Sequence, residues 1–317
     1  MKNPFVTNGY VSPEYFCDRE KETAKIVSLL TNENNIALIS PRRLGKTDLL
    51  RHCFGQPEIK EHYHTFIIDI YATSSVRDFV NVFGKAVLDE LRPKGKSVWG
   101  TFLNVLASLR SEITFDMNGQ PTWGIGLGAI TNPSATLDEI FSYLNNAGKP
   151  CLIAIDEFQQ ITKYADDPNI EAALRTHIQR CSNAHFVFSG SHRHLMGAMF
   201  TSPARPFYQS VTLINLPPIS VDKYAEFCLK HFERVSKHLD TLVVTELYER
   251  FNGITSYMQK VMNILFSMTG TGEICIPSMI DTAINDLLDF SADTYDALLY
   301  QMPEKQRIVF MAIAAEG

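Results

Sequence analysis

Four short apolar runs, each followed by polar or helical sequence, constrain the fold of this chain more than any other feature. They span residues 35–39, 66–70, 151–155 and 185–188. Their apolar residues follow one another without alternation, which is typical of strands buried on both faces of a parallel sheet. Amphipathic helical patterns fill the sequence between them, over residues 79–91, 137–144 and 169–181. This order predicts an α/β domain, in which helices flank a parallel sheet.

One stretch, residues 112–130, departs from this pattern. Ile113–Met117 alternates in polarity and Asn118-Gly119 is a strong turn signal, so we expect a β-hairpin inserted before the strand at 151. The glycine-rich sequence that follows does not join a strand to a helix, so it is no dinucleotide-binding fingerprint. Thr136-x-x-Glu139 has the form of a capping box and predicts where the next helix begins.

The character of the chain changes after Pro217-Pro218. Helical patterns follow one another over residues 221–236, 241–251 and 256–268, separated by Gly253 and a Thr-Gly-Thr-Gly turn. The 317 residues suffice for about two domains. We therefore expect a core over residues 1–216 with the hairpin near 112–130, a small all-α lid over 217–285, and a further segment over 286–317.

Composition excludes several classes of protein. Hydrophobic residues make up 45% of the chain and charged residues 20%, which is ordinary for a globular core. Lys and Arg number 29 against 35 acidic residues, a net charge of −6, which disfavours a chain-wide surface for nucleic acid. The six cysteines form no CxxC motif, and no signal peptide or apolar run of roughly 20 residues is visible. These features predict a cytoplasmic protein with reduced cysteines and no membrane contact.

The loop after the first apolar run carries the strongest chemical signal. It fits the P-loop pattern G-x-x-x-x-G-K-[ST] between a strand and a helix, with Ser40 in place of the first glycine. Gly45 lets the backbone approach a phosphate, Lys46 reaches the β- and γ-phosphates, and the Thr47 hydroxyl coordinates Mg²⁺. The predicted contacts to ATP or ADP are Ser40, Pro41, Arg42, Arg43, Leu44, Gly45, Lys46, Thr47 and Asp48.

A second motif follows the apolar run at 151–155. Asp156 stands at the end of that strand, where it can hold Mg²⁺, and Glu157 can polarise an attacking water. The extra strand between the two motifs favours the ATPase division with an added central strand. A GTPase is disfavoured, because the nearest base-reading sequence, Thr162-Lys163-Tyr164-Ala165, lacks the required Asp.

A polar group ends the next strand as well, in Ser189-Gly190-Ser191. One of these serines is placed to orient water or to sense the γ-phosphate, and we expect Ser191 to join Glu157 and Lys46 as catalytic residues. His192 and His194 have no acidic or thiol companion nearby, so we expect solvated histidines there.

The chain resembles the archaeal-type AAA ATPases of the STAND group, which are also common in bacteria. The similarity lies in Asn3-Pro4-Phe5, in residues 16–22, in Pro41–Thr47, in the strand with Asp156-Glu157 and in Ser-Gly-Ser. Three positions depart from the family pattern. Asp18 replaces a Gly, Ser210 stands where the family has an Arg (the nearest, Arg205, is five residues earlier), and Gly253-Ile254-Thr255 lacks the Pro. The resemblance implies an AAA/ASCE-type core, a helical lid, and the beginning of a winged helix over residues 286–317.

Further residues and partners are implied by the resemblance. Phe16 would pack on the adenine and Arg19 would contribute to the nucleotide site. Arg19 and Glu20 would also fix the N-terminal segment to the core by polar pairs. ATP, Mg²⁺, and a second copy or a protein partner would bind. DNA would bind only through a winged helix completed beyond residue 317, so residues 1–317 alone are expected to bind no duplex at physiological salt.

Two functions compete on the sequence. The first is a Mg-dependent ATPase that acts as a nucleotide-driven switch, in which hydrolysis reorients the lid. The second is a non-hydrolysing module that holds a nucleotide while another region binds DNA or protein. A small-molecule kinase is a weaker third reading, since no arginine-rich acceptor lid is recognisable and Asp156-Glu157 would have no purpose there.

Overall fold

The structure is a computed structural model and describes residues 3–91, 113–115, 121–123 and 132–316. The chain forms two compact units, one from Arg19 to Pro217 and one that joins the residues up to Asp18 with those from Pro218 onward. The N-terminal segment therefore groups with the helical unit, whereas the sequence placed it in the core. The reason is Phe5, which is fully buried and packs against the rings of Phe232 and Phe266 in the helical unit.

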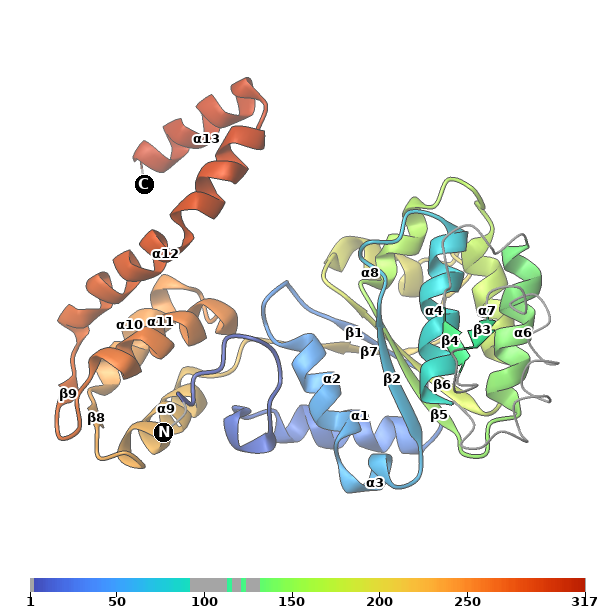
Figure 1. Ribbon diagram of the computed structural model, residues 1–317, viewed down its shortest axis with the longest axis horizontal. Helices are drawn as coiled ribbons and strands as arrows, with labels where there is room; N and C mark the ends of the chain where they lie inside the picture. The colour runs from blue at the N-terminus through green and yellow to red at the C-terminus, as the bar shows by residue number, and fades with distance from the viewer. Residues whose placement is uncertain (1–2, 92–112, 116–120, 124–131, 317) are drawn as a thin grey trace. The chain divides into compact units, whose positions relative to one another are not determined.

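The unit from Arg19 to Pro217 is built on a five-stranded parallel sheet in the order β2-β5-β6-β1-β7 (Figure 1). Its strands are β1 (Ile36–Ile39), β2 (His64–Asp69), β5 (Cys151–Asp156), β6 (Ala184–Gly190) and β7 (Thr212–Asn215). The four predicted strands are thus confirmed. Sequence reasoning missed β7, because this short edge strand is only partly buried and has no continuous apolar run.

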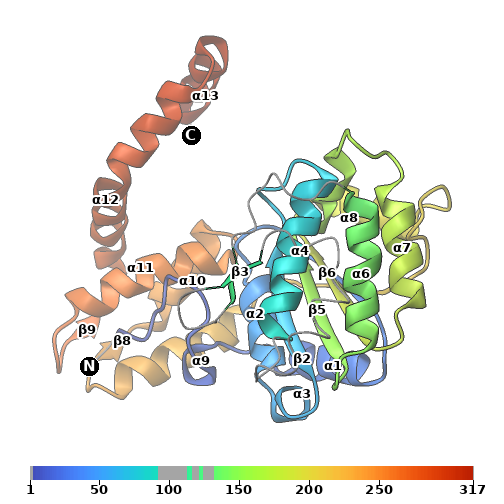
Figure 2. The same cartoon turned by 45° about the vertical axis from the view of Figure 1, so that its right-hand side comes forward.

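Helices cover the sheet on both faces, as Figures 1 and 2 show. One face packs against helices that contribute to a shared aromatic core, in which Phe141 contacts both Phe83 and Phe186 of β6. These helices are α4 (Val76–Glu90), α6 (Pro133–Asn145), α7 (Ile170–Arg180) and α8 (Arg193–Thr201). The other side of the sheet carries α1 (Glu20–Thr31) and α2 (Lys46–Phe54), and α3 (Pro57–Lys60) leads into β2.

The start of α6 corrects one prediction. Its N-cap is Asn132, whose side-chain oxygen accepts a hydrogen bond from Ala135 N, and Pro133 occupies the first helical turn. Thr136, predicted as the cap, lies inside the helix and its hydroxyl donates to the Asn132 carbonyl. Proline fits the first turn because it needs no hydrogen-bond acceptor there, so the helix begins earlier than the capping-box pattern indicated.

The predicted hairpin is confirmed in its strand pairing. β3 (Ile113–Phe115) pairs antiparallel with β4 (Pro121–Trp123), in the register Ile113 to Trp123. The turn dipeptide Asn118-Gly119 and the glycine-rich residues 124–130 lie outside the described residues.

The helical unit contains the three predicted helices, α9 (Val221–Glu233), α10 (Thr241–Arg250) and α11 (Thr255–Met268). Tyr224, Val261 and Leu265 form part of its buried core. A two-stranded parallel sheet of β8 (His238–Leu239) and β9 (Ile274–Cys275) joins the connecting loops. Short 3₁₀ turns, Pro13–Tyr15 and Pro277–Met279, complete the unit.

Two further helices end the described chain, α12 (Ile280–Gln301) and α13 (Glu304–Glu316). The boundary expected between residues 285 and 286 falls inside α12, because no Gly or Pro interrupts the helix before Pro303. The helix expected from Glu304 is confirmed, yet no residue of α13 is buried. Within the described ranges no helix is both long and apolar enough to cross a membrane. All six cysteines are buried and form no disulfide.

Candidate active site

The P-loop connects β1 to α2 and is shaped by two residues at its ends. Ser40 is fully buried and its backbone N–H donates to the Gly190 carbonyl of β6 at 3.3 Å. Gly45 is the N-cap of α2 with φ +83°, a left-handed conformation that suits glycine. Only open space surrounds the position that its Cβ would take. The loop therefore presents an unobstructed backbone at a helix N-terminus, the arrangement that binds phosphate.

Lys46, at the first position of α2, turns back onto the loop. Its ammonium donates to the carbonyls of Ser40 at 3.0 Å and of Pro41 at 3.1 Å, and only 6% of the residue is exposed. Burial lowers the pKa of Lys46, against the opposing charges of Asp156 and Glu157. A buried cation that is held by two carbonyl oxygens is favourably placed to accept a phosphate.

The two motifs meet at Thr47 and Asp156. The Thr47 hydroxyl donates to Asp156 Oδ2 at 2.6 Å, and Asp156 Oδ1 accepts the backbone N–H of Glu157 at 3.0 Å. Asp156 ends β5 and is 8% exposed. A hydroxyl and a carboxylate are the hard oxygen donors that Mg²⁺ prefers, so this pair fits the predicted ion.

Glu157 follows directly with φ +55°, a left-handed conformation at the N-cap of the next 3₁₀ segment. Its Oε2 accepts a hydrogen bond from the Ser191 hydroxyl at 2.8 Å and another from Gln159 Nε2. Ser189, the alternative serine, has a buried hydroxyl without a hydrogen-bond partner in the described part of the chain. The structure thus brings Ser191, and not Ser189, to the predicted catalytic glutamate.

The arginines of the loop lie on its exposed side. Arg42 Nε donates to Ser191 Oγ at 3.4 Å, and its guanidinium lies 5.2 Å from the centre of the Tyr71 ring. Tyr71 is 55% exposed and follows β2, and sequence reasoning missed it. Arg43 is exposed and left-handed at φ +69°, while Leu44 is buried as an apolar anchor of the loop. Asp48 is half-buried in the first turn of α2.

The two predicted N-terminal contacts are on separate units. Arg19 is 3% exposed and pairs with Glu22 at 2.9 Å, and it also donates to the Pro217 carbonyl at 2.7 Å. Its acidic partner is therefore Glu22 rather than the exposed Glu20. Phe16 is half-buried in the helical unit, where its ring contacts the edge of Tyr10 at 5.6 Å. Their contacts with a nucleotide stay predictions.

Two groups of the core unit were not anticipated. Gln159 touches Glu157, although nothing in the run Phe158-Gln159-Gln160 marks it as functional. Arg205 pairs with the buried Glu171 of α7, 34 residues earlier in the chain. Burial raises the pKa of Glu171, against the effect of Arg205. Only a tertiary structure could reveal either contact.

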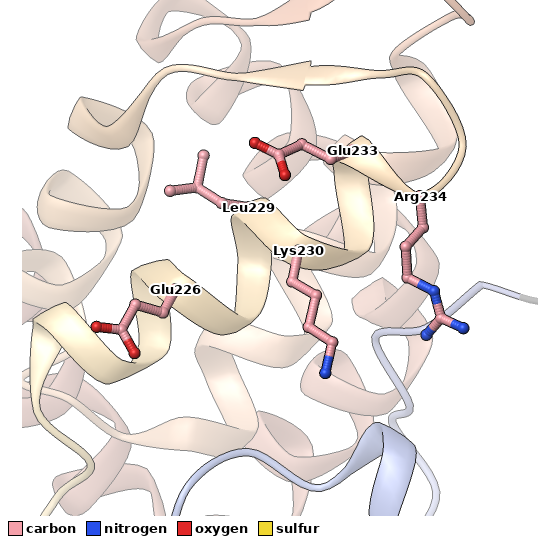
Figure 3. Close-up of a pocket in the computed structure, with 5 residues that line it drawn as sticks. All are labelled: Glu226, Leu229, Lys230, Glu233 and Arg234. Carbon is pink, nitrogen blue, oxygen red and sulfur yellow. The ribbon is translucent and has the colours of Figure 1, made fainter.

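A surface hollow of about 580 Å³ lies elsewhere, on α9 of the helical unit (Figure 3). It is lined by Glu226, Leu229, Lys230, Glu233 and Arg234. Two carboxylates and two cations cancel in formal charge, so the hollow favours no charged ligand, and no predicted site residue lines it.

The sheet order together with the P-loop and the acidic strand end defines a P-loop NTPase fold of the AAA/ASCE type. Residues 16–261 match the family described as an ATPase domain predominantly from Archaea, and the chain belongs to that family. No curated protein matches the chain.

Solved structures share this fold at low sequence identity. The Walker-type ATPase PABY2304 of Pyrococcus abyssi is 18% identical with a TM-score of 0.63, over 94% of this chain and 79% of that one. The ORC2 protein of Aeropyrum pernix, solved as ADPNP–ADP complexes, is 14% identical with a TM-score of 0.58, over 90% and 71%. The ORC1 protein of the same organism, in complex with DNA, is 13% identical with a TM-score of 0.57, over 96% and 73%.

Proposed function

We propose that this chain is a Mg-dependent ATPase whose nucleotide state drives a conformational switch. One observation carries the proposal: the Thr47 hydroxyl meets the Asp156 carboxylate at 2.6 Å, one residue away from the buried ammonium of Lys46. Residues 109 positions apart thereby form one site with a cation for phosphate and hard oxygens for a metal. Membership of an ATPase family supports this assignment.

The residues divide the work as follows. Loop N–H groups and the N-terminus of α2 bind the phosphates, and Lys46 exchanges its carbonyl partners for phosphate oxygens. Thr47 and Asp156 hold Mg²⁺, which when bound supplies neutralising charge at the phosphates. Glu157 orients a water and accepts its proton, and the Ser191 hydroxyl holds the glutamate in place.

The finer assignments belong to the same proposal. We propose membership of the STAND group, a cytoplasmic location, and a second copy or a protein partner that responds to the switch. A winged helix would supply any contact with DNA. The nucleotide complexes of ORC2 and the DNA complex of ORC1 support the proposed nucleotide and DNA contacts by analogy of fold only.

Steady-state release of phosphate tests the function. Glu157→Gln keeps the shape of the side chain but loses the base, so turnover falls by about 10² or more while ATP affinity in calorimetry is retained. Glu58→Gln removes the same charge from the exposed surface of α3 and serves as the control, with parental turnover. Turnover that survives in Glu157→Gln would refute the role of this glutamate.

The alternative is a module that holds the nucleotide without hydrolysing it. It is favoured by the arrangement of Lys46, whose ammonium donates to two carbonyls of the loop. Lys46 would have to exchange these partners for phosphate oxygens before hydrolysis. A parent protein that binds ATP tightly in calorimetry but releases no phosphate, even when Mg²⁺ is saturating, would decide for this alternative.

A further inference from the structure

A buried amide contacts the proposed catalytic base and has no role in the mechanism so far. Gln159 is 3% exposed, and its Nε2 donates to Glu157 Oε2, the same oxygen that accepts the Ser191 hydroxyl. Its own Oε1 is buried and has no hydrogen-bond partner among the residues that the structure describes. A buried acceptor without a partner is unfavourable for folding. Stability of the fold alone therefore does not explain a glutamine at this position.

The charge of Glu157 determines how this amide is oriented. An ionised carboxylate can only accept hydrogen bonds, so the NH₂ group of Gln159 must face it. The reverse orientation would place two acceptors against each other. The carbonyl end of the amide consequently points toward β6, where it meets Gly190.

Gly190 provides the space for this amide. A Cβ at Gly190 would overlap Gln159 Oε1 and would also lie 2.6 Å from Cγ and Sδ of Met196. The φ of Gly190 is not positive, so the position needs the absence of a side chain rather than the conformational freedom of glycine. Gly190 also pairs with Ile39 and accepts the N–H of Ser40, so this space lies beside the P-loop strand.

The turn that carries Gln159 is held by packing before this residue and by hydrogen bonds after it. The turn is the 3₁₀ segment Phe158–Lys163, in which Phe158 is fully buried. Gln160 Nε2 donates to the Thr73 carbonyl at 2.9 Å, and the Tyr164 hydroxyl lies 2.5 Å from that of Thr73. The backbone of Gln159 therefore has little freedom, and its amide is presented to Glu157 in a fixed position.

We infer that Gln159 is a positioning residue for ATP hydrolysis, which holds Glu157 in the rotamer that serves the lytic water. The inference rests on the proposed function. Gln159 and Ser191 both bind Oε2, whereas Oε1 receives no hydrogen bond from the described residues. Two donors on one oxygen pin the carboxylate and leave the other oxygen to accept a hydrogen bond from water. Orientation of this kind lowers the barrier because the geometry is set before the reaction begins.

The test compares two isosteric changes in the same turn. Gln159→Leu removes the donor, so kcat falls at least tenfold while KM and the calorimetric ATP affinity stay within twofold. Gln160→Leu is the matched control, because the amide that it removes donates to the Thr73 carbonyl; kcat stays within twofold and only the melting temperature falls. In a Glu157→Gln background, Gln159→Leu has less than a twofold effect, since the group that it positions is no longer a base.

Gly190 provides a second arm of the test. Gly190→Ala lowers kcat in the parent, and it lowers kcat by a smaller factor in a Gln159→Ala background, where only the overlap with Met196 remains. Unchanged kcat in Gln159→Leu, or an equal loss in Gln160→Leu, would overturn the inference while the ATPase function stands. A parent protein without any turnover would overturn both the ATPase function and the role of Gln159. That outcome is seen with the parent alone, so it cannot be confused with a failure of the inference about Gln159.

Discussion

Lys46 is the residue on which nucleotide binding depends most directly. Its buried ammonium donates to two carbonyl oxygens instead of to water. When phosphate oxygens replace these carbonyls, the new hydrogen bonds are charge-assisted and contribute about 1.5–3 kcal/mol each. Lys46→Ala should weaken ATP binding at least tenfold in calorimetry. Lys85→Ala, an exposed change on α4, should leave the affinity as in the parent. Parental affinity in a folded Lys46→Ala variant would place the nucleotide elsewhere.

The residues of the site differ in how far sequence could predict them. Gly45, Lys46, Thr47, Asp156 and Glu157 stand in local motifs whose spacing follows from a strand end, so the pattern alone locates them. Sequence could not decide whether Ser189 or Ser191 meets Glu157. In the structure the Ser191 hydroxyl donates to Glu157, whereas the Ser189 hydroxyl is buried and has no partner among the described residues. Gln159 depends on space left by Gly190, which no local pattern records.

At the scale of elements, the cap of α4 is the clearest target. Ser75 Oγ accepts a hydrogen bond from the Asp78 backbone N–H at 3.1 Å, and Asp166 accepts that of Val76. Ser75→Ala leaves one of these donors unsatisfied and should cost about 1 kcal/mol. In a unit of this size the melting temperature should fall by about 2–4 °C.

Ser75→Gly tests whether the loss in Ser75→Ala comes from the capping hydroxyl. Ser75→Gly should cost only a few tenths of a kcal/mol, because glycine adopts the extended cap conformation and leaves the N–H open to water. An equal loss in both variants would mean that the serine hydroxyl does not stabilise the helix.

Elements with strong local periodicity were predictable, and those defined by distant partners were not. The four buried strands and the helices α9, α10 and α11 follow from apolar runs and helical spacing. The edge strand β7 depends on β1, and β8 and β9 depend on each other across more than 30 residues. The start of α6 was misplaced because a capping-box pattern competed with Asn132-Pro133, which in fact opens the helix.

At the scale of the molecule, four histidines couple stability to pH. Burial lowers the pKa of His52, His177, His185 and His231. In the unfolded chain these histidines have a pKa of about 6.5, whereas their pKa in the folded chain is lower. The unfolded state therefore binds more protons below that pH, and stability should fall as the pH drops through 6.5.

Thermal unfolding at pH 7.5 and 5.5 measures this coupling. The melting temperature should be lower at pH 5.5, by about 2–4 °C for each kcal/mol lost. His231→Phe should reduce the difference, because its ring packs among Phe5, Tyr15 and Phe227 and its Nε2 has no hydrogen-bond partner in the described structure. A higher melting temperature at pH 5.5 would contradict the assignment.

The strand order has a consequence for how the protein is made. β1, which leads into the P-loop, lies between β6 and β7, although both are translated long after it. At 5–20 residues per second, the ribosome needs on the order of 10–35 s to proceed from β1 to the end of β7. Until β6 is complete β1 has neither of its strand neighbours, and contacts of such sequence separation form slowly. One hydrogen-bonding edge of β1 thus stays unpaired in the nascent chain until translation passes Asn215. Slower synthesis between β2 and β6 would prolong the time for which the nascent chain depends on chaperones.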